Sequence, residues 1–245
     1  MSIKENNGPD PRFRKTKISG LLLFLMQRNL IFLPEHLSKE LLESYGIKTA
    51  RCVFAETEDE AVEAAKKIGF PVVMKVVSSG IIHKSDVGGV LLGIEGEEEV
   101  RESFHRLMKI PKAEGVNVQP MLKKGIEVIV GVMEDKQFGR VIMFGLGGIF
   151  VEVYQDVSFR ILPITKRDAE EMIKEIKGYR ILSGYRGFGG FGGFKGDVKS
   201  LVELLVKISG MAEREKIREM DLNPIFVYEE GYAVADARIW KEVQI

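Results

Sequence analysis

The chain has 245 residues, of which 45% are hydrophobic and 29% charged, and its 36 basic side chains equal its 36 acidic ones in number. This composition excludes a disordered chain, which would be poor in hydrophobic residues and far from neutral. Zero net charge argues against a nucleic-acid-binding protein, whose usual footprint is a basic field. Cys52 is the only cysteine, so neither an internal disulfide nor a thiolate zinc site can form, and we expect a cytoplasmic protein.

Residues 1–33 are predicted to form a polar arm followed by a buried apolar helix. Leu21–Met26 and Leu30–Leu33 are apolar, but three polar residues separate them, and the run falls short of the about 20 apolar residues that span a bilayer. Prolines and charges precede the run and no small-residue cleavage site is present, so a signal peptide fits poorly. We therefore expect no membrane partner.

Residues 34–117 are predicted to form an N-terminal lobe in which helices and strands alternate. One helix begins at Pro34 and ends at Gly46, and Thr57 with Glu60 forms a capping box for a second. The other elements expected in this lobe are a helix over Glu97–Lys109 and strands at Arg51–Ala55, Pro71–Val77, Val90–Ile94 and Gly115–Pro120.

Residues 118–245 are predicted to form a larger, strand-rich lobe. Thr165 with Asp168 starts one helix, and Asp197 caps another that has a single apolar face. The expected strands are Ile126–Met133, Arg140–Phe144, Phe159–Leu162, Glu219–Val227 and Tyr232–Ala237, with a hairpin turn at Glu134–Gly139. The predicted fold class is therefore α/β (α+β), with two lobes around a ligand-binding cleft and a hinge at Val118–Leu122.

Two residues of the N-terminal lobe are candidates for chemistry. Lys75 stands in the middle of a hydrophobic strand, where its ammonium group must pair, snorkel or meet an anion such as phosphate; exposure on an edge strand is the alternative. His83 lies in a loop, after two isoleucines and before charged residues and a glycine pair. An imidazole there acts as a general base, a metal ligand, a covalent acceptor or a simple hydrogen-bonding group. The segment alone leaves these readings open. The other two histidines are expected on solvated helix faces, at His36 and His105.

Two clusters in the larger lobe also suggest a ligand. Gly145–Gly148 has backbone amides that suit a phosphate, although it lacks the lysine of a P-loop and a plain turn is an equal reading. Asn223 and Asp236 lie on two strands that we expect to be neighbours, and they offer the oxygen donors that magnesium prefers; two turn-forming residues are the alternative. Lysine, glycine loops and oxygen ligands together indicate a site for nucleotide phosphates.

The sequence resembles a known family over about residues 37–240. The segments that carry the resemblance are PVVMKVVSSGIIHKSDVGGVLLGI, VQPMLKKGIEVIVGV, FGLGGIFVEVYQDVSFRI and EMDLNPIFV…YAVADARI. They are similar to the β subunit of the ADP-forming acetate–CoA ligases (acetyl-CoA synthetase, ADP-forming), which has an ATP-grasp fold. The resemblance implies the reaction acyl-CoA + ADP + phosphate ⇌ acid + CoA + ATP.

The resemblance also implies a division of labour. A separate α subunit, in an α2β2 assembly, would bind CoA, make the acyl phosphate and carry a first phosphohistidine. His83 aligns with the β-subunit phosphohistidine that passes the phosphoryl group to ADP. The residues expected to support its loop are Lys84, Ser85 and Asp86.

For the nucleotide site, the resemblance assigns Lys75 to the phosphates. It places adenine against a hinge formed by Gln119, Pro120, Met121 and Leu122. Asn223 and Asp236 match the Mg²⁺ ligands of the related succinyl–CoA ligase β chain. The further residues expected to bind nucleotide are Glu127, Gly147, Gly148 and Glu152.

Three other readings of the chain stay open at this point. A succinyl-CoA ligase-like β subunit would share the nucleotide chemistry, because acid specificity should reside in the partner. A non-catalytic ATP-sensing module would bind ATP without phosphorylating His83. An ATP-grasp ligase that joins a carboxylate to an amine would need an acceptor pocket of its own. The roles of residues 1–33 and of the Gly187–Gly196 run are not assigned.

Overall fold

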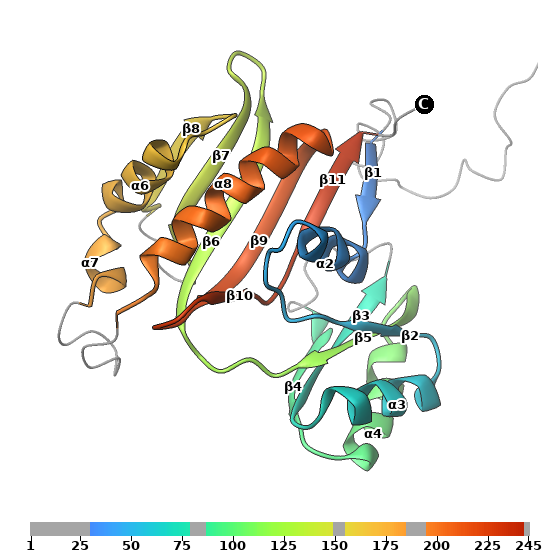
Figure 1. Ribbon diagram of the computed structural model, residues 1–245. Coiled ribbons are helices and arrows are strands. Elements are labelled where there is room, and N and C mark those ends of the chain that lie inside the picture. Colours follow the sequence, from blue (N-terminus) through green and yellow to red (C-terminus); the bar gives the residue numbers. More distant parts are fainter. Residues whose placement is uncertain (1–29, 79–86, 149–154, 185–194, 243–245) are drawn as a thin grey trace, which may run out of the picture.

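The structure, a computed structural model, describes residues 30–78, 87–148, 155–184 and 195–242. These residues form a seven-stranded and a four-stranded sheet, each with helices packed against it (Figure 1). All strand pairs within the two sheets are antiparallel, so the α+β form of the predicted fold class is confirmed. No helix in the described ranges is long and apolar enough to cross a membrane.

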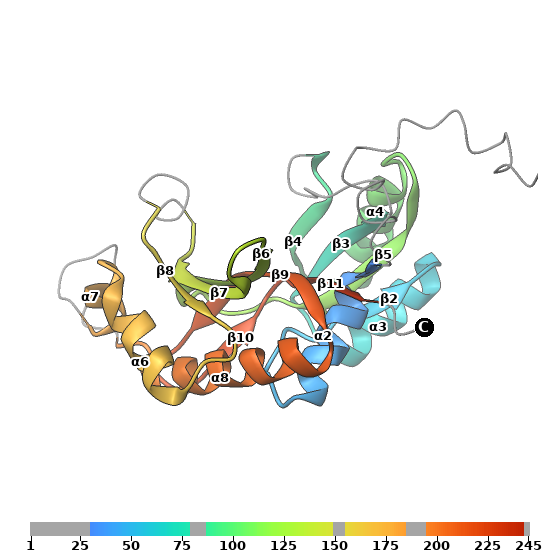
Figure 2. The same cartoon turned by 90° about the horizontal axis from the view of Figure 1, so that it is seen from above.

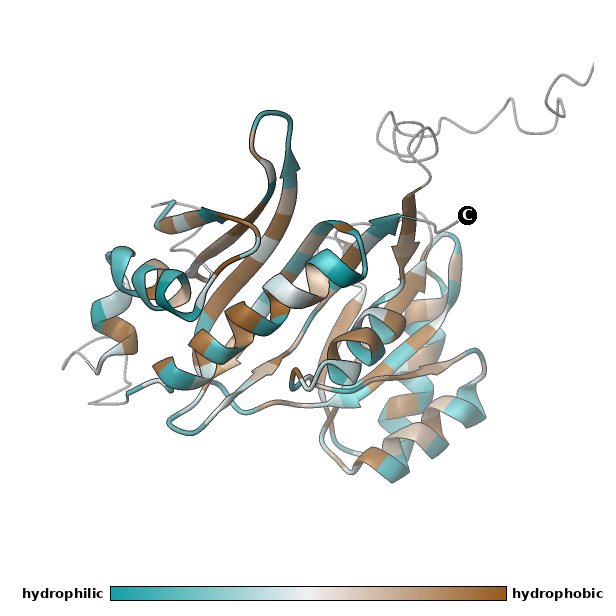
Figure 3. Cartoon of the chain, turned by 45° about the horizontal axis from the view of Figure 1, so that its top comes forward, coloured by the Kyte–Doolittle hydropathy of each residue, from teal (hydrophilic) through white to brown (hydrophobic). Residues whose placement is uncertain are grey.

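The larger sheet has the strand order β1-β11-β9-β6-β7-β8, and β10 pairs with β9. Helices α6 (Lys166–Glu175) and α8 (Val198–Arg214) lie on the same side of this sheet (Figure 2). The apolar stripe of α8, visible in Figure 3, packs with inward side chains of the strands into one core. The strands are β1 (Leu30–Leu33), β6 (Ile126–Asp135), β7 (Gly139–Leu146), β8 (Val157–Ile161), β9 (Ile217–Val227), β10 (Tyr232–Val234) and β11 (Arg238–Glu242).

The smaller sheet has the strand order β2-β5-β3-β4 and its own apolar core. Val72, Met74 and Val76 of β3 point into this core, which helices α3 and α4 cover. Because side chains alternate along a strand, Lys75 points to the opposite face, toward the larger lobe. The elements are β2 (Val53–Ala55), α3 (Glu58–Ile68), β3 (Val72–Ser78), β4 (Val90–Ile94), α4 (Glu97–Met108) and β5 (Ala113–Pro120).

The structure corrects the expectations for the N-terminal part. Leu30–Leu33, predicted to be helical, is strand β1 and pairs with β11, where Phe32 packs on Trp240 at 4.9 Å between ring centroids. A short apolar run does not reveal its period, which is why the sequence pattern was ambiguous there. Helix α2 (Glu35–Ser44) begins where expected, but its Leu42 lies in the core of the larger lobe rather than in that of the smaller one.

Other elements differ at the C-terminal end. The strand expected over Tyr232–Ala237 stops at Val234, and β11, which was not predicted, follows it. A short helix, α7 (Tyr179–Leu182), was not predicted either. The hairpin between β6 and β7 and both capping boxes are confirmed. Most of the Gly187–Gly196 run and the whole Leu21–Met26 segment lie outside the described residues.

Asp197 caps α8 with both carboxylate oxygens. It accepts hydrogen bonds from the Ser200 amide (3.0 Å), the Ser200 hydroxyl (2.6 Å) and the Gly231 amide (2.8 Å), and these bonds lower the pKa of the carboxyl, the Ser200 hydroxyl most. We expect Asp197→Ala to lower the free energy of unfolding by about 1–2 kcal/mol at pH 7 in urea titrations. Because the pKa falls on folding, this contribution is complete above the unfolded value of 3.8 and disappears as the pH drops below it. Glu203→Ala, on the exposed side of α8, is the control; an equal loss there would contradict the capping role.

Candidate functional site

Lys75 lies at the junction of the two lobes, in the middle of β3. Its ammonium group donates hydrogen bonds to Glu35 Oε1 (2.6 Å), to the Ala235 carbonyl (3.0 Å) and to Asp236 Oδ1 (3.1 Å), and its side chain is 8% exposed. Burial alone would lower the pKa of this ammonium, but the carboxylates of Glu35 and Asp236 raise it above its ordinary value. Lys75 is therefore a cation at any physiological pH. Because β3 lies between β5 and β4, the alternative reading of Lys75 as a lysine exposed on an edge strand is wrong.

Sequence reasoning missed Lys39, which lies beside Lys75 and is 1% exposed. Its ammonium group donates to Glu35 Oε1 (2.9 Å), to Gln119 Oε1 (2.7 Å) and to the Ala235 carbonyl (2.9 Å). In the sequence, Lys39 is one of several charged residues on an amphipathic helix. Only its partners, 80 and 196 positions away along the chain, distinguish it from a solvated lysine.

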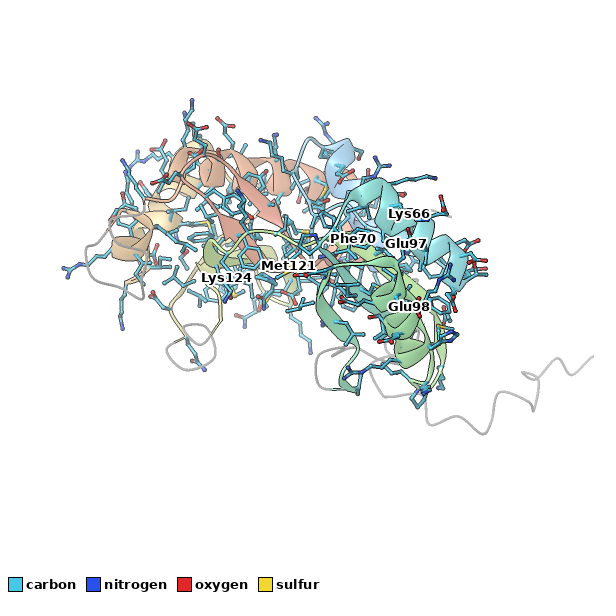
Figure 4. The ribbon with its side chains drawn as sticks, turned by 90° about the horizontal axis from the view of Figure 1, so that it is seen from below. Lys66, Phe70, Glu97, Glu98, Met121 and Lys124 are labelled. Atoms are coloured by element: carbon cyan, nitrogen blue, oxygen red, sulfur yellow. The ribbon has the colours of Figure 1, made fainter. Side chains whose placement is uncertain are left out.

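The predicted hinge runs from the end of β5 into the connection to β6. Gln119 is buried and its side chain reaches the junction, where Nε2 also lies 3.4 Å from the Ala235 carbonyl. Pro120 and Leu122 are half-buried, whereas Met121 is exposed and its amide donates to the Pro71 carbonyl at 3.1 Å. Figure 4 shows Met121 beside Phe70, with Lys124 farther along the connection. Of the four hinge residues, Gln119 thus lies in the buried junction and Met121 lies at the surface.

The predicted metal ligands lie on adjoining segments. β10 pairs with β9 through Val234 and Ile225, and the Ala235 amide donates to the Pro224 carbonyl at 2.9 Å, so the backbone next to Asn223 adjoins the backbone next to Asp236. Asn223 is exposed, and the side chain of Asp236 is 18% exposed. The structure therefore brings together the two segments that the sequence analysis paired.

The donor set at these segments fits magnesium in its chemistry. Asp236 carries two cationic neighbours, Lys75 and, at 3.8 Å, Arg238, so its carboxylate is already placed among positive charges. Asp221, two residues before Asn223 and opposite Arg238 in the register, adds an oxygen donor that sequence reasoning did not select. No cluster of three or more His, Cys, Asp or Glu side chains suited to a metal is found in the described ranges. A magnesium ion there would depend on Asp236, on Asn223 and on oxygens of the nucleotide itself.

Glu127, Gly147 and Gly148 lie together at the start of β6 and the end of β7. The Gly147 amide donates to the Glu127 carbonyl at 2.8 Å, so this amide is already used within the protein. Gly148 has a positive φ of 61°, and a Cβ on it would come within 3.3 Å of Glu127 Oε2. This turn needs glycine for its backbone conformation and for its close approach to Glu127.

Several predicted residues lie outside the described ranges: His83, Lys84, Ser85, Asp86 and Glu152. The strands that precede and follow the His83 segment are nevertheless informative. β3 and β4 pair antiparallel, with Lys75 opposite Val90, and the Val76 amide donates to the Gly89 carbonyl at 2.8 Å. The strands that flank the His83 segment in the sequence are therefore neighbours in the smaller sheet, and one of them carries Lys75.

The two other histidines differ from each other. His105 is 66% exposed on α4 and contacts Glu58 at 2.6 Å, as a solvated histidine would. His36 is only half-exposed and stacks on Phe54 with 5.0 Å between ring centroids, so the expectation of a solvated face is wrong for it.

Asn117 is a further polar residue of the junction that the sequence analysis missed. It lies opposite Lys75 in the register of β5 and β3 and is fully buried. Neither of its side-chain amide atoms has a hydrogen-bond partner in the described part of the chain. A buried amide without partners costs free energy, and its position beside Lys75 makes it available to a bound ligand.

We expect Asn117→Val to raise the free energy of unfolding of the ligand-free protein by about 1 kcal/mol, or about 2–4 °C in melting temperature, because an unsatisfied amide is replaced by an apolar group. The matched control is Gln119→Met on the same strand and face, which removes an amide that does have partners and should destabilise. Differential scanning calorimetry measures both. A loss of stability in Asn117→Val would mean that the amide is satisfied in solution.

Comparison with known proteins identifies a family and similar relatives. A family described as "ATP-grasp domain" matches residues 25–240. "Acetate--CoA ligase [ADP-forming] II" of Archaeoglobus fulgidus is 66% identical over 85% of this chain, which spans only 30% of that relative. "Acetate--CoA ligase [ADP-forming] I subunit beta" of Pyrococcus furiosus is 48% identical over 84% of this chain and 90% of the relative.

A representative solved structure is similar in both fold and sequence. It is the dinucleotide-forming acetyl-coenzyme A synthetase 1 of Ca. Korarchaeum cryptofilum, in complex with coenzyme A and Mg-AMPPCP, with its "phosphohistidine segment pointing towards nucleotide binding site". The TM-score is 0.74 and the sequence identity 42%, over 90% of this chain and 97% of that one. Similarity at this level extends across both lobes.

Proposed function

This chain belongs to the ATP-grasp family, among the β subunits of the ADP-forming acetate–CoA ligases, and from that premise we propose that it forms ATP from ADP in such an enzyme. The overall reaction would be acyl-CoA + ADP + phosphate ⇌ acid + CoA + ATP. The observation that carries the proposal is the placement of Lys75. A buried cation on β3 of the smaller lobe faces oxygen donors of the larger lobe, and the segment that contains His83 follows this strand in the sequence.

In this proposal His83 carries the phosphoryl group. The partner makes the acyl phosphate, and the phosphoryl group reaches His83 by way of the partner's own histidine. The bond between phosphorus and the His83 imidazole then breaks while an oxygen of the terminal phosphate of ADP forms a new bond to phosphorus. Phosphorylated His83 and ADP thus give His83 and ATP. Lys84, Ser85 and Asp86, which adjoin His83 in the sequence, would steady the added negative charge and the loop.

The other residues hold the nucleotide. Lys75 would neutralise a phosphate oxygen of ADP, and Gln119–Leu122 would pack against adenine, with Glu127, Gly147, Gly148 and Glu152 completing the site. Asn223 and Asp236 would hold Mg²⁺, which supplies neutralisation of the nucleotide phosphates. Phosphoryl transfer requires mainly positioning and charge neutralisation, and the geometry of Lys75 and Asp236 supports both.

The proposal includes a partner. A relative that this chain covers over 90% of its length is named a β subunit, and that name implies a partner subunit. We propose an α subunit that binds CoA, in an α2β2 assembly in the cytoplasm. The acid that is activated would be selected by that partner, so a succinyl-CoA ligase-like subunit differs from this proposal mainly in the partner.

The proposal is tested by covalent labelling. The chain is incubated with magnesium and γ-labelled ATP, with and without the α subunit, and its peptides are mapped under alkaline conditions that preserve phosphohistidine. We expect label on the peptide that contains His83. Binding of Mg-ATP without label under both conditions would overturn the proposal and identify a nucleotide-sensing module instead.

A further inference from the structure

The two buried lysines at the junction share their acceptors. An ammonium group has three N–H donors, and all three of Lys39 and all three of Lys75 are used. Both lysines donate to the same oxygen, Glu35 Oε1, and both donate to the carbonyl oxygen of Ala235. Each lysine has one further acceptor, Gln119 for Lys39 and Asp236 for Lys75. The two side chains therefore form one hydrogen-bonded unit.

The partners of Lys75 differ in how easily they can be released. The side chain of Glu35 is 2% exposed and also pairs with Lys39. If its carboxylate moved away, the buried ammonium groups of Lys39 and Lys75 would both lose an ion pair. The Ala235 carbonyl is part of the backbone. Asp236 is the most exposed of the carboxylates, its bond to Lys75 is the longest of the three, and Arg238 lies within 3.8 Å to balance its charge. Asp236 is therefore the partner that Lys75 can exchange.

Lys39 fixes the other two acceptors. It binds Glu35 from one turn along the same helix, α2, and it holds the Ala235 carbonyl together with Gln119 of β5. These contacts connect α2, the smaller sheet and the segment between β10 and β11. Without the Lys39 ammonium, Glu35 and the Ala235 carbonyl would each lose one of the donors that determine their orientation.

We propose that Lys39 is a positioning residue for the phosphate-binding lysine. Through Glu35 and the Ala235 carbonyl it holds Lys75 in place and leaves Asp236 as the single partner that Lys75 exchanges for a phosphate oxygen. The inference rests on the proposed function, since it takes Lys75 as the nucleotide-phosphate ligand. It assigns to α2, which lies outside the predicted nucleotide site, a part in recognising the phosphate end of the nucleotide.

The test compares Lys39→Met with the wild type by isothermal titration calorimetry of the intact chain, with ADP, AMP and adenosine in excess magnesium. Loss of charge-assisted hydrogen bonds that orient Lys75 should weaken ADP binding about tenfold or more. Adenosine, which has no phosphate, should bind as in the wild type. Lys207→Met is the matched control: it removes an exposed lysine that donates to the Gly46 carbonyl just after α2, at 2.7 Å, and should change neither affinity.

A second variant guards against misfolding. Lys39→Met leaves Glu35 with a single cation, whereas Glu35→Gln combined with Lys39→Met removes one charge of each sign, and neutral replacements of buried ion pairs are usually tolerated. The double variant should fold, as checked by its thermal melt, and should also lose the preference for ADP over adenosine. Lys39→Met should add little to Lys75→Met, because both act on the same ammonium group.

The outcomes separate cleanly. Equal weakening of ADP and adenosine would make Lys39 a structural residue only, and unchanged ADP affinity or additive effects with Lys75→Met would also overturn the inference. A wild-type chain that binds ADP no better than adenosine would instead overturn the proposed function on which the inference rests.

Discussion

His83→Ala is expected to lower ATP formation by the complex of this chain with the proposed α subunit by about a thousandfold or more, because the proposed covalent carrier has no substitute in that role. The other two histidines are His36, which stacks on Phe54, and His105, which contacts Glu58 on α4. The measurement is the rate of ATP formation from acetyl-CoA, ADP and phosphate. Mg-ADP affinity, measured by calorimetry, should change little, since Lys75, Asn223 and Asp236 remain.

His105→Ala is the matched control for this variant. His105 is exposed on the smaller lobe and its imidazole contacts a carboxylate, so replacing it removes the same side chain without touching the proposed carrier. The rate should stay close to that of the wild type. Turnover retained in His83→Ala would refute the phosphohistidine role even if nucleotide binding were intact.

The second large effect is expected from Lys75→Met, which should weaken Mg-ADP binding about thirtyfold to a hundredfold while adenosine affinity stays close to that of the wild type. The estimate follows from the loss of one charge-assisted contact worth about 2–3 kcal/mol. Because Glu35 and Asp236 raise the pKa of Lys75, the ammonium is fully present below its ordinary pKa and deprotonates only in strong alkali. The difference between wild type and variant should therefore be constant from about pH 6 to pH 9.

The matched control for Lys75→Met is Lys66→Met. Lys66 is on the exposed side of α3, 43% exposed, and pairs with Glu97 at 2.9 Å (Figure 4). This variant removes the same charge from the smaller lobe at a distance from the junction. If both variants weakened ADP binding equally, the effect would come from net charge rather than from contact with phosphate.

The elements that the sequence predicted correctly are those with local signals. Three helices begin at side-chain caps whose partners lie within three residues, so these caps are visible in the sequence. The capping residues are Thr57 with Glu60, Thr165 with Asp168, and Asp197. Residues 72–77 of strand β3 are apolar except for Lys75, which made that lysine conspicuous. The segments around Asn223 and Asp236 were expected to be neighbours because only a short turn separates their strands.

The contacts that were not predicted join residues far apart in the chain. Lys39 looks like a surface residue of an amphipathic helix until β5 and the Ala235 segment are placed beside it. Strand β1 forms because it can pair with β11, which lies about two hundred positions later in the chain. Asn117 lies between Val116 and Val118 in a strand whose sequence is mostly apolar. Only the register, which places it opposite Lys75, shows that its amide lies at the junction. Local patterns carry no information on such pairings.

The two apolar cores, one around each sheet, have a consequence for cooperativity. The side chains of the larger core and those of the smaller core form separate clusters, and the contacts of Lys39 and Lys75 between them are polar. We expect two cores linked in this way to unfold as two units. The stronger the coupling at the junction, the closer together their two unfolding transitions lie. A nucleotide that binds both lobes adds its binding free energy to that coupling. A bound nucleotide would thus make the two lobes unfold more nearly as one cooperative unit than they do in the polypeptide alone.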